Sequence, residues 1–250
     1  MKISIITAVF NSSKTIERAI NSIKNQTYKN IELIIIDGCS NDGSIEIIEN
    51  LIDKNDIFIS ESDDGIYDAL NKGINIASGQ IIGFLHADDL YADSDVISRV
   101  LKVFNEHKCD IVYGDASYFS PDKISKTVRK YKSDQLTKKN LAWGKMPVHP
   151  SIFIKKIIYD KHGYFKTKFK IAGDYDFLCR IINDKSISSS YISSNFVLKQ
   201  QGGISTTRTI KNTILLNKEV YTAIKENNIY TNIFMLLSRY ISKILQLINK

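Results

Sequence analysis

The chain has 250 residues, of which 43% are hydrophobic, 24% charged and 10% aromatic. This composition is enough for a packed core and excludes a disordered tail, a collagen-like fibre and a low-complexity linker. With 34 Lys and Arg against 27 Asp and Glu, the net charge is +7, which suits anionic partners such as nucleotides, phospholipid headgroups or nucleic acid. Three scattered cysteines, Cys39, Cys109 and Cys179, form no CxxC pair or Cys/His cluster, which disfavours zinc and a disulfide framework.

The sequence shows neither a secretory nor a membrane-spanning segment. No apolar run reaches the roughly 20 residues that a spanning helix needs. The first residues run straight into a short apolar strand and lack the length and cleavage site of a signal peptide. We therefore expect a cytoplasmic protein, either free or peripheral on the inner face of the cell membrane.

Strand and helix patterns alternate over residues 1–115. Short apolar runs predict strands, and apolar residues at helical spacing predict amphipathic helices between them. The expected strands cover residues 3–9, 31–36, 57–60, 81–85 and 111–113, and the expected helices cover 13–25, 44–53, 66–77 and 95–105. This alternation predicts an α/β fold with a mostly parallel sheet, helices on both faces, and ligands beyond the carboxyl ends of the strands.

The alternation weakens in the second half of the chain. We expect a hairpin over residues 118–132, a strand over 151–154 and a helix over 172–183. No Pro- or Ser-rich linker divides the chain, so residues 1–205 are expected to form one unit, followed by a helical segment over residues 206–250.

An amphipathic pattern marks residues 229–250. Its apolar stripe consists of Ile233, Phe234, Leu237, Ile241, Ile244, Leu245 and Ile248. Basic residues lie off this stripe, among them Arg239, Lys243 and Lys250. The pattern fits a helix packed on the core or on a partner chain, and fits equally a helix lying on a membrane surface.

Acidic clusters follow three successive predicted strands, at residues 37–43, 61–65 and 86–89. A fourth cluster, residues 173–176, opens a predicted helix. Carboxylates gathered at one sheet edge repel one another unless a cation neutralises them, and Mg²⁺ or Mn²⁺ with oxygen ligands commonly bridges to substrate phosphates. The alternative for each single cluster is helix capping, because the aspartates Asp42, Asp63 and Asp174 all lie where helical patterns begin.

Glycine-rich phosphate-binding loops are absent from the sequence. There is no GxxxxGK[ST], and no GxGxxG follows the first strand. The first loop instead reads Ala8-Val9-Phe10-Asn11-Ser12-Ser13. A nucleotide bound here is therefore held by acidic groups, a metal ion and backbone.

Three segments together resemble the family 2 glycosyltransferases, which have the GT-A fold. They read ITAVFNSSKTIERAINSIKNQTYKNIELIIIDGCSNDGS from Ile6, DDGIYDALNKGINIASGQIIGFLHADD from Asp63, and AGDYDFLCRI from Ala172. The resemblance extends from residue 3 to about 203 and implies a GT-A domain over residues 1–205. Within it, residues 1–115 would bind the nucleotide-sugar and residues 116–205 the acceptor.

The resemblance also implies roles for individual residues. The donor side, which binds the nucleotide-sugar, comprises Ala8, Val9, Phe10, Asn11, Asp37, Asp63, His86 and Ala87. Among these, Val9 and Phe10 match the loop that contacts the base, Asp37 the acid that hydrogen-bonds uracil, and Asp63 the loop that closes over the nucleotide. Asp88 matches the last acid of the D-x-D motif, which binds Mn²⁺ or Mg²⁺ on the diphosphate. Asp174 matches the catalytic base.

Two positions depart from the family pattern. His86 stands where the first acid of D-x-D usually lies, and Gly173 stands where a glutamate usually precedes the base. The first departure bears on metal affinity, whereas the second leaves Asp174 itself in place.

The resemblance implies transfer of one hexose or N-acetylhexosamine from a UDP-sugar, with inversion. The expected acceptor is a saccharide linked to undecaprenyl diphosphate, in O-antigen, capsule or exopolysaccharide assembly, and the basic tail would bring the enzyme to the membrane. No QxxRW motif follows residues 200–203, and this absence argues against a processive polysaccharide synthase. The alternative is a non-catalytic nucleotide- or carbohydrate-binding protein on the same scaffold. Nucleic acid is disfavoured because the strand-end loops are acidic.

Three further features remain open at this stage. His149, in the motif His149-Pro150-Ser151, either lies near the acceptor or is a satisfied structural histidine. Trp143 either stacks on an acceptor sugar or packs in the core. The segment 200–203 falls near the position where the family closes the donor site.

Overall fold

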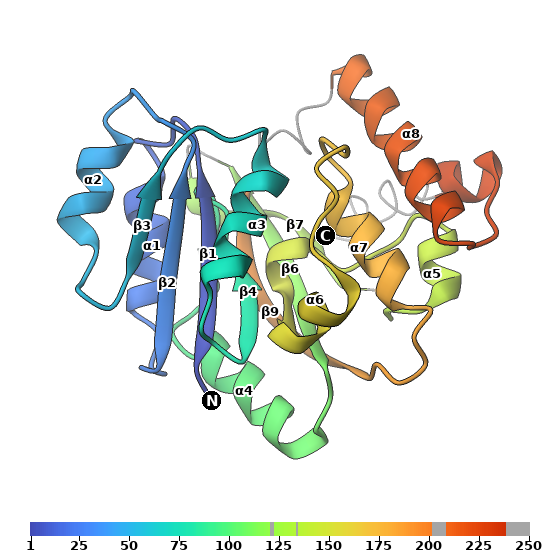
Figure 1. Ribbon diagram of the computed structural model, residues 1–250, viewed down its shortest axis with the longest axis horizontal. Helices are drawn as coiled ribbons and strands as arrows, with labels where there is room; N and C mark the ends of the chain where they lie inside the picture. Colours follow the sequence, from blue (N-terminus) through green and yellow to red (C-terminus); the bar gives the residue numbers. More distant parts are fainter. Residues whose placement is uncertain (121–122, 134, 202–208, 239–250) are drawn as a thin grey trace.

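The computed structural model describes residues 1–120, 123–133, 135–201 and 209–238, arranged as Figure 1 shows. Within these residues nine strands form one sheet in the order β3-β2-β1-β4-β8-β6-β9-β5, with β7 paired to β6. The strands are β1 (Ile3–Val9), β2 (Ile31–Asp37), β3 (Ile57–Ser60), β4 (Ile81–Phe84), β5 (Leu90–Tyr91), β6 (Ile111–Ser120), β7 (Lys123–Tyr131), β8 (Ile152–Lys155) and β9 (Ser189–Gln200). The helices are α1 (Ile16–Lys24), α2 (Ser44–Leu51), α3 (Ile66–Ile76), α4 (Val96–His107), α5 (Lys138–Ala142), the 3₁₀ helix η1 (His149–Ser151), α6 (Lys156–His162), α7 (Gly173–Ile181) and α8 (Ile210–Glu226).

The sheet is mixed but mostly parallel, which confirms the predicted fold class. β1 pairs in parallel with β2 and β4, and β2 pairs in parallel with β3. β8 runs antiparallel between β4 and β6, β9 lies parallel to β6, and β5 is antiparallel to β9. The isoleucine-rich β1 and β2 are buried along nearly their whole length, as strands covered on both faces must be.

Two apolar cores lie on the two faces of this sheet. Successive side chains of a strand point to opposite faces, so Ile34 and Ile36 of β2 belong to one core while Leu33 and Ile35 belong to the other. The first core includes side chains of α3, α6, α7 and α8, and the second includes side chains of α1, α2 and α4. With both faces covered, the edge formed by the strand ends is where the sheet can offer a binding site.

The predicted elements of the first half all form, with some shifted ends. α1 begins at Ile16 rather than residue 13, because the Thr15 and Ile16 N–H groups close a turn on the Ser12 carbonyl. β6 extends to Ser120 rather than 113, because β7 and β9 pair with its residues beyond 113. The pairing of β6 with β7 confirms the hairpin, whose residues 121–122 lie outside the described residues.

The C-terminal segment is helical in α8 and again over residues 233–238. The prediction of a helix from residue 229 is wrong at its start, because residues 229–232 are not helical and the first and third of them are buried. Ile229 and Thr231 are buried, and the Thr231 hydroxyl donates a hydrogen bond to the Ala142 carbonyl at 2.7 Å. Leu236 is also buried in the core. Three residues of the predicted stripe are exposed: Ile233, Phe234 and Leu237.

The rest of the predicted stripe, from residue 239 to 250, lies outside the described residues. In the part of the chain that the structure describes, the longest apolar stretches of helix fall short of what crossing a membrane requires.

Candidate active site

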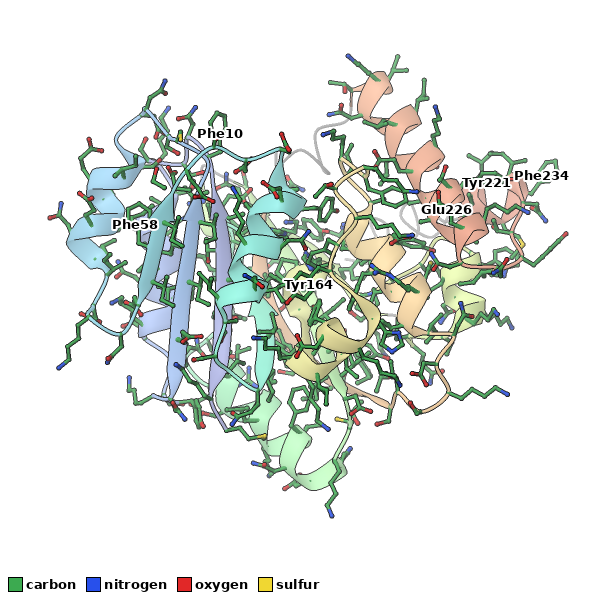
Figure 2. The ribbon with its side chains drawn as sticks, in the orientation of Figure 1. Phe10, Phe58, Tyr164, Tyr221, Glu226 and Phe234 are labelled. Carbon is green, nitrogen blue, oxygen red and sulfur yellow. The ribbon has the colours of Figure 1, made fainter. Side chains whose placement is uncertain are left out.

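The carboxyl ends of the parallel strands bring the first two acidic loops together. Val9 at the end of β1 is paired with Asp37 at the end of β2, and Asp37 is paired with Ser60 at the end of β3. Phe10, the residue after β1, is 65% exposed, and Figure 2 shows it at this edge of the molecule. An exposed aromatic ring in this position offers a face on which a base can stack.

Asp37 is fully buried under its own loop. Its carboxylate accepts hydrogen bonds from the Ser40 N–H at 2.9 Å, from the Ser40 hydroxyl, and from the Ser60 hydroxyl at 2.7 Å. Asn11 extends this network, because its N–H donates to Ser40 Oγ at 2.8 Å and its Oδ1 accepts the Asn41 N–H at 3.0 Å. The carboxylate expected to meet the base therefore also orders the loop between β2 and α2.

Because Gly38 has no side chain, the loop after β1 and the loop after β3 can meet beside it. A Cβ at this position would approach Asp63 Oδ2 to 2.6 Å and the Phe10 ring to 3.4 Å. Asp63 also accepts the Gly65 N–H at 2.8 Å, just before α3, so it has a capping role as well as a place in the site. Asp42, by contrast, accepts hydrogen bonds from Ser44, the first residue of α2, and from the Ser13 N–H at 3.0 Å, so it ties the loop after β1 to the start of α2.

The loop after β4 presents one free carboxylate. Asp89 is buried and pairs with Lys199 Nζ at 2.9 Å, and it also accepts the Gln200 N–H at 3.1 Å. Although burial opposes the charge, the carboxylates of Asp89 and Asp88 raise the pKa of Lys199. Ala87 is buried, whereas Asp88 is half-buried, and within the described residues no hydrogen bond or ion pair occupies its carboxylate. The β4 loop is thus fixed by Asp89 and leaves Asp88 able to bind a ligand.

A divalent ion fits this loop only in a site completed by the substrate. The described residues contain no cluster of three or more His, Cys, Asp or Glu side chains that could hold a metal by themselves. Mg²⁺ is commonly bound by one or two carboxylates together with substrate phosphates, and the free carboxylate of Asp88 suits that arrangement. Burial, with Lys199 and His149 nearby, holds the pKa of His86 well below its usual range, so its imidazole is neutral. A neutral imidazole, unlike a protonated one, can ligate Mn²⁺.

Asp174 lies in the first turn of α7, across from these loops. Its carboxylate accepts the Tyr175 N–H at 2.8 Å and lies 3.0 Å from the Tyr67 hydroxyl of α3. Burial and the charge of Asp174 raise the pKa of Tyr67 well above its usual value, so its phenol is neutral. Its one proton faces two acceptors, the Ile171 carbonyl at 2.7 Å and the Asp174 carboxylate. A Cβ on Gly173 would approach the Tyr67 ring to 2.8 Å. Tyr67 therefore occupies the space that a glutamate at position 173 would need, which explains this departure from the family pattern.

His149 lies between the β4 loop and Asp174. Its ring centroid is 4.7 Å from that of Phe84, 5.6 Å from Phe165 and 5.7 Å from His86. Burial lowers its pKa, while the Asp174 carboxylate acts to raise it. Its Nε2 is buried and has no hydrogen-bond partner among the described residues. That unpaired nitrogen does not fit the alternative of a satisfied structural histidine.

Asp176, two residues after the candidate base, has a different environment. It is fully buried and its carboxylate lies 3.1 Å from Lys166 Nζ, 3.0 Å from Asn227 Nδ2 and 3.5 Å from an Arg180 nitrogen. These contacts join α7 to the segments on either side of it. Asp176 therefore stabilises the fold, and Asp174 is the α7 carboxylate available to a substrate.

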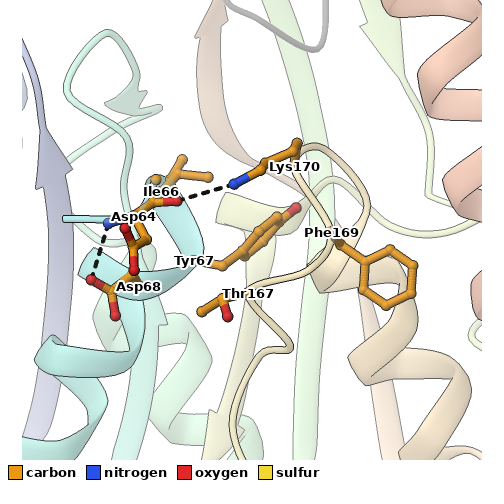
Figure 3. A pocket seen from close by; sticks show the side chains of 8 residues that line it. Asp64, Ile66, Tyr67, Asp68, Thr167, Phe169 and Lys170 are labelled. Carbon is orange, nitrogen blue, oxygen red and sulfur yellow. Dashed lines mark hydrogen bonds between the residues drawn. The ribbon is translucent and has the colours of Figure 1, made fainter.

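The loop before α7 is held from the outside by α8. The Glu219 carboxylate accepts the N–H groups of Lys170, Ile171 and Ala172 at 2.8–2.9 Å. Lys170 Nζ in turn donates to the Asp64 carbonyl at 3.3 Å, next to a small pocket between this loop and α3 (Figure 3). Tyr67 and Phe169 line this pocket, so it adjoins the candidate base through Tyr67.

The sequence did not single out three residues that the structure brings to the site: Tyr67, Arg18 and Lys199. Arg18 donates to the Gln200 side chain and lies 3.4 Å from the Asp88 carbonyl, and Lys199 fixes Asp89. All three lie inside regular helices or strands, where a polar residue carries no motif. Gln200, which the sequence placed near the donor site, contacts two of the same residues: its side chain accepts from Arg18 and its N–H donates to Asp89. Trp143 is 38% exposed after α5, so it is not a core residue.

The sheet and the helices around it form a fold of GT-A type. The structure of S. aureus TarS residues 1–349 in complex with UDP-GlcNAc has a TM-score of 0.71 to this chain, at 19% sequence identity over 90% of this chain and 66% of that one. The mannosyltransferase PcManGT of Pyrobaculum calidifontis, in complex with GDP-Man and Mn²⁺, has a TM-score of 0.65 at 15% identity, over 88% of this chain and 64% of that one. The chain thus spans just under two thirds of these neighbours.

Residues 4–173 match the model of the glycosyl transferase family 2, and the chain belongs to this family. The PGL/p-HBAD biosynthesis glycosyltransferase of Mycobacterium tuberculosis is 29% identical over 195 residues, which cover 76% of this chain and 73% of the relative. A glycosyltransferase of Haemophilus influenzae is 38% identical over 119 residues, or 46% of this chain and 47% of the relative. The resemblance inferred from the sequence motifs is confirmed.

Proposed function

We propose that this glycosyltransferase moves one hexose or N-acetylhexosamine from a UDP-sugar, with inversion, to a hydroxyl of a lipid-linked saccharide. The observation that carries the proposal is the position of His149, whose ring centre lies 5.7 Å from that of His86 in the loop of Asp88 and which is near enough to Asp174 for the charge of that carboxylate to act on it. Uridine as the nucleotide is supported by the TarS neighbour, which was solved with UDP and with UDP-GlcNAc.

The donor side consists of the loops after β1, β2, β3 and β4. In the proposed complex the base lies against Phe10, beside Asp37 and Asp63. Of the remaining donor-side positions, Ala8 and Val9 end β1, Asn11 lies in the loop after it, and His86 and Ala87 lie in the loop after β4. Asp88 would hold Mn²⁺ or Mg²⁺ at the diphosphate, a role supported by the Mn²⁺ in the PcManGT structure. When bound, the ion would stabilise the negative charge of the leaving diphosphate as a Lewis acid.

Asp174 is the proposed base for the acceptor. A sugar hydroxyl is a poor nucleophile at neutral pH, and Asp174 takes its proton as the hydroxyl attacks the donor sugar. The neutral Tyr67 phenol, 3.0 Å from the Asp174 carboxylate, orients that carboxylate. One base opposite the leaving group gives a single displacement, so an α-linked UDP-sugar yields a β-glycoside.

The proposed acceptor is a saccharide carried by undecaprenyl diphosphate, in the assembly of O-antigen, capsule or exopolysaccharide. Such an acceptor is confined to a membrane, so the enzyme would work as a peripheral protein on the inner face of the cell membrane. Nucleic acid is not among the proposed partners.

The test is donor hydrolysis measured with Mn²⁺ or Mg²⁺ over a panel of UDP-hexoses and UDP-N-acetylhexosamines, with GDP-mannose as the matched comparison. We expect turnover of one UDP-sugar that depends on the metal and is lost in Asp174→Asn. Turnover of GDP-mannose alone would refute the uridine donor. Tight UDP binding without hydrolysis or transfer would favour the alternative, a non-catalytic binding protein on the same scaffold.

A further inference from the structure

The C-terminal part of the structure exposes an unusual concentration of apolar side chains. Of the twelve large apolar side chains exposed among the described residues, seven lie between residues 210 and 237. These seven are Ile210, Ile214, Tyr221, Tyr230, Ile233, Phe234 and Leu237, exposed by 42% to 82%. Figure 2 shows Tyr221 and Phe234 at the same outer margin of the molecule. We call these residues, with the lysines described next, the α8 outer face.

Lysines form a row beside the apolar residues. Lys211, Lys218 and Lys225 are spaced seven residues apart, so on a helix they lie along one side, adjacent to Ile214 and Tyr221. Lys225 Nζ lies 5.6 Å from the centre of the Tyr221 ring and 6.0 Å from that of Tyr230, which links α8 to the segment after it. Apolar side chains flanked by lysines are the arrangement of a helix that lies in a membrane interface.

No acidic side chain of α8 offsets these lysines. Glu219 is buried and accepts three backbone N–H groups of the loop before α7. Glu226 is paired with Lys166 at 3.3 Å and Lys168 at 2.6 Å. The α8 outer face is therefore cationic, and its partner is expected to be anionic.

We propose that the α8 outer face docks on an anionic lipid bilayer. The apolar side chains enter the boundary between headgroups and acyl chains, and the lysines bind the anionic headgroups. A second copy of the chain fits less well, because a two-fold dimer through this face would place one lysine row against the other. The proposal deepens the proposed function, on which it rests for the acceptor's lipid. It also moves the expected membrane contact from residues 229–250 to α8 and residues 230–237.

The docked orientation keeps the candidate active site near the membrane. In Figure 1 the N-terminal end of α8 rises on the side of the molecule toward which β1, β2 and β3 point. α8 is also joined to the loop before Asp174 through Glu219. An acceptor sugar held at the bilayer surface would therefore reach the site from the side that α8 occupies.

The test is flotation of the full-length protein with vesicles of equal parts phosphatidylcholine and phosphatidylglycerol, compared with vesicles of phosphatidylcholine alone. We expect binding to the mixed vesicles only, weakened by salt. The triple variant Lys211→Gln/Lys218→Gln/Lys225→Gln should bind about a hundredfold more weakly. Its matched control replaces three exposed lysines elsewhere, Lys29, Lys54 and Lys102, by glutamine and should bind like the wild type.

The apolar side chains are tested by the double variant Ile214→Ser/Phe234→Ser. Both side chains are exposed, so the melting temperature should not change, while vesicle binding should fall at least about tenfold. Ile157→Ser is the matched control, because Ile157 is 66% exposed on α6.

Several outcomes would overturn the proposal. These are equal binding to both kinds of vesicle, unchanged binding by both sets of variants, or a dimer in solution that Ile214→Ser/Phe234→Ser dissociates without affecting flotation. UDP-sugar hydrolysis by the same variants, measured without vesicles, should equal that of the wild type. A wild-type protein that hydrolyses a UDP-sugar but does not float with the mixed vesicles therefore refutes the membrane surface alone. A wild-type protein that floats but hydrolyses no UDP-sugar refutes the proposed function alone.

Discussion

The two ends of the parallel sheet use the same residue types in opposite ways. At the amino-terminal end, Glu32 is buried and accepts hydrogen bonds from Lys2, Ser4 and Ser78, so its bonding capacity is filled by the protein. At the carboxyl end, Asp88 is half-buried and its carboxylate has no partner among the described residues. A carboxylate whose bonds are all internal contributes to stability, whereas one left open is available to a ligand.

The largest expected effect comes from the base at the open end. Asp174→Asn should lower kcat by about 10²–10⁴-fold and leave the melting temperature and UDP affinity nearly unchanged, because the shape is kept and the base is lost. Steady-state kinetics and calorimetry measure this.

Asp176→Asn is the matched variant two residues away. It weakens a buried ion-paired network, so it should lower the melting temperature and leave the kcat of the folded enzyme close to normal. The reverse pattern, with Asp176→Asn inactive and stable, would place the base at Asp176.

Asp88→Ala should reduce metal-dependent transfer by well over tenfold while the fold survives. The reason is that Asp88 is the open carboxylate of the β4 loop, whereas Asp89 holds that loop through Lys199. UDP binding measured with increasing Mn²⁺ should lose its metal dependence in this variant. Glu46→Ala, an exposed acid on α2, should behave like the wild type, and transfer by Asp88→Ala within tenfold of normal would rule out the metal role.

Glu32→Gln tests the closed end of the sheet and should cost about 2–3 kcal/mol of unfolding free energy with normal kcat. Burial opposes the charge of Glu32, but the hydrogen bonds from Lys2, Ser4 and Ser78 outweigh it and lower its pKa to about 2. A lowered pKa in the folded state means that this stabilisation is present above the ordinary glutamate pKa and is lost as the pH falls toward 2.

Unfolding experiments across the acid range check this sign. The wild type should lose part of its stability as the pH falls from about 4.5 to 2, and Glu32→Gln should lose less over the same interval. Parallel curves for the two proteins would show that Glu32 contributes nothing to acid sensitivity.

Asp37→Ala should weaken UDP binding by about 1–3 kcal/mol, because it removes a hydrogen-bonding group and releases the loop that Ser40 anchors. Ser60→Ala separates the two effects, since it removes one bond to Asp37 and keeps the carboxylate. Calorimetry should show a smaller loss for Ser60→Ala, and an unchanged affinity in Asp37→Ala would exclude the base contact.

The smallest effect is expected from Tyr67→Phe, which keeps the ring packed against Gly173 and removes the hydroxyl that lies 2.7 Å from the Ile171 carbonyl and 3.0 Å from Asp174. Loss of one such bond corresponds to about 1 kcal/mol, or about a fivefold lower kcat. Because Tyr67 acts through Asp174, the pH at which kcat rises should shift as well. A lower kcat with an unchanged pH profile would indicate a structural role instead.

The sequence was sufficient for the parallel half of the fold because its strands and helices are short, strongly patterned and consecutive. β1 to β4 and the helices between them could be predicted from isoleucine runs and helical spacing. The full length of β6 could not, since its outer residues are stabilised by β7 and β9, which lie far along the chain.

The same distinction holds for the site. Asp88 and Asp174 belong to local motifs, so the resemblance predicted them as site residues. Tyr67 acts through Asp174, 107 positions away, and Lys199 acts through Asp89, 110 positions away. A single sequence holds no signal for such pairs. The predicted start of the last helix, residue 229, was wrong for a related reason. Ile229 and Thr231 are buried by contacts with the core, and these contacts outweigh the amphipathic pattern.

The three hydrogen bonds from residues 170–172 to Glu219 have a consequence for biosynthesis. The loop that presents Asp174 is anchored by a side chain that leaves the ribosome more than forty residues later. A nascent chain that ends before α8 has all nine described strands and every donor-side residue, but lacks the anchor for its base. Nucleotide binding is therefore expected to appear during synthesis before transfer activity does, and full activity only once α8 has been released and packed.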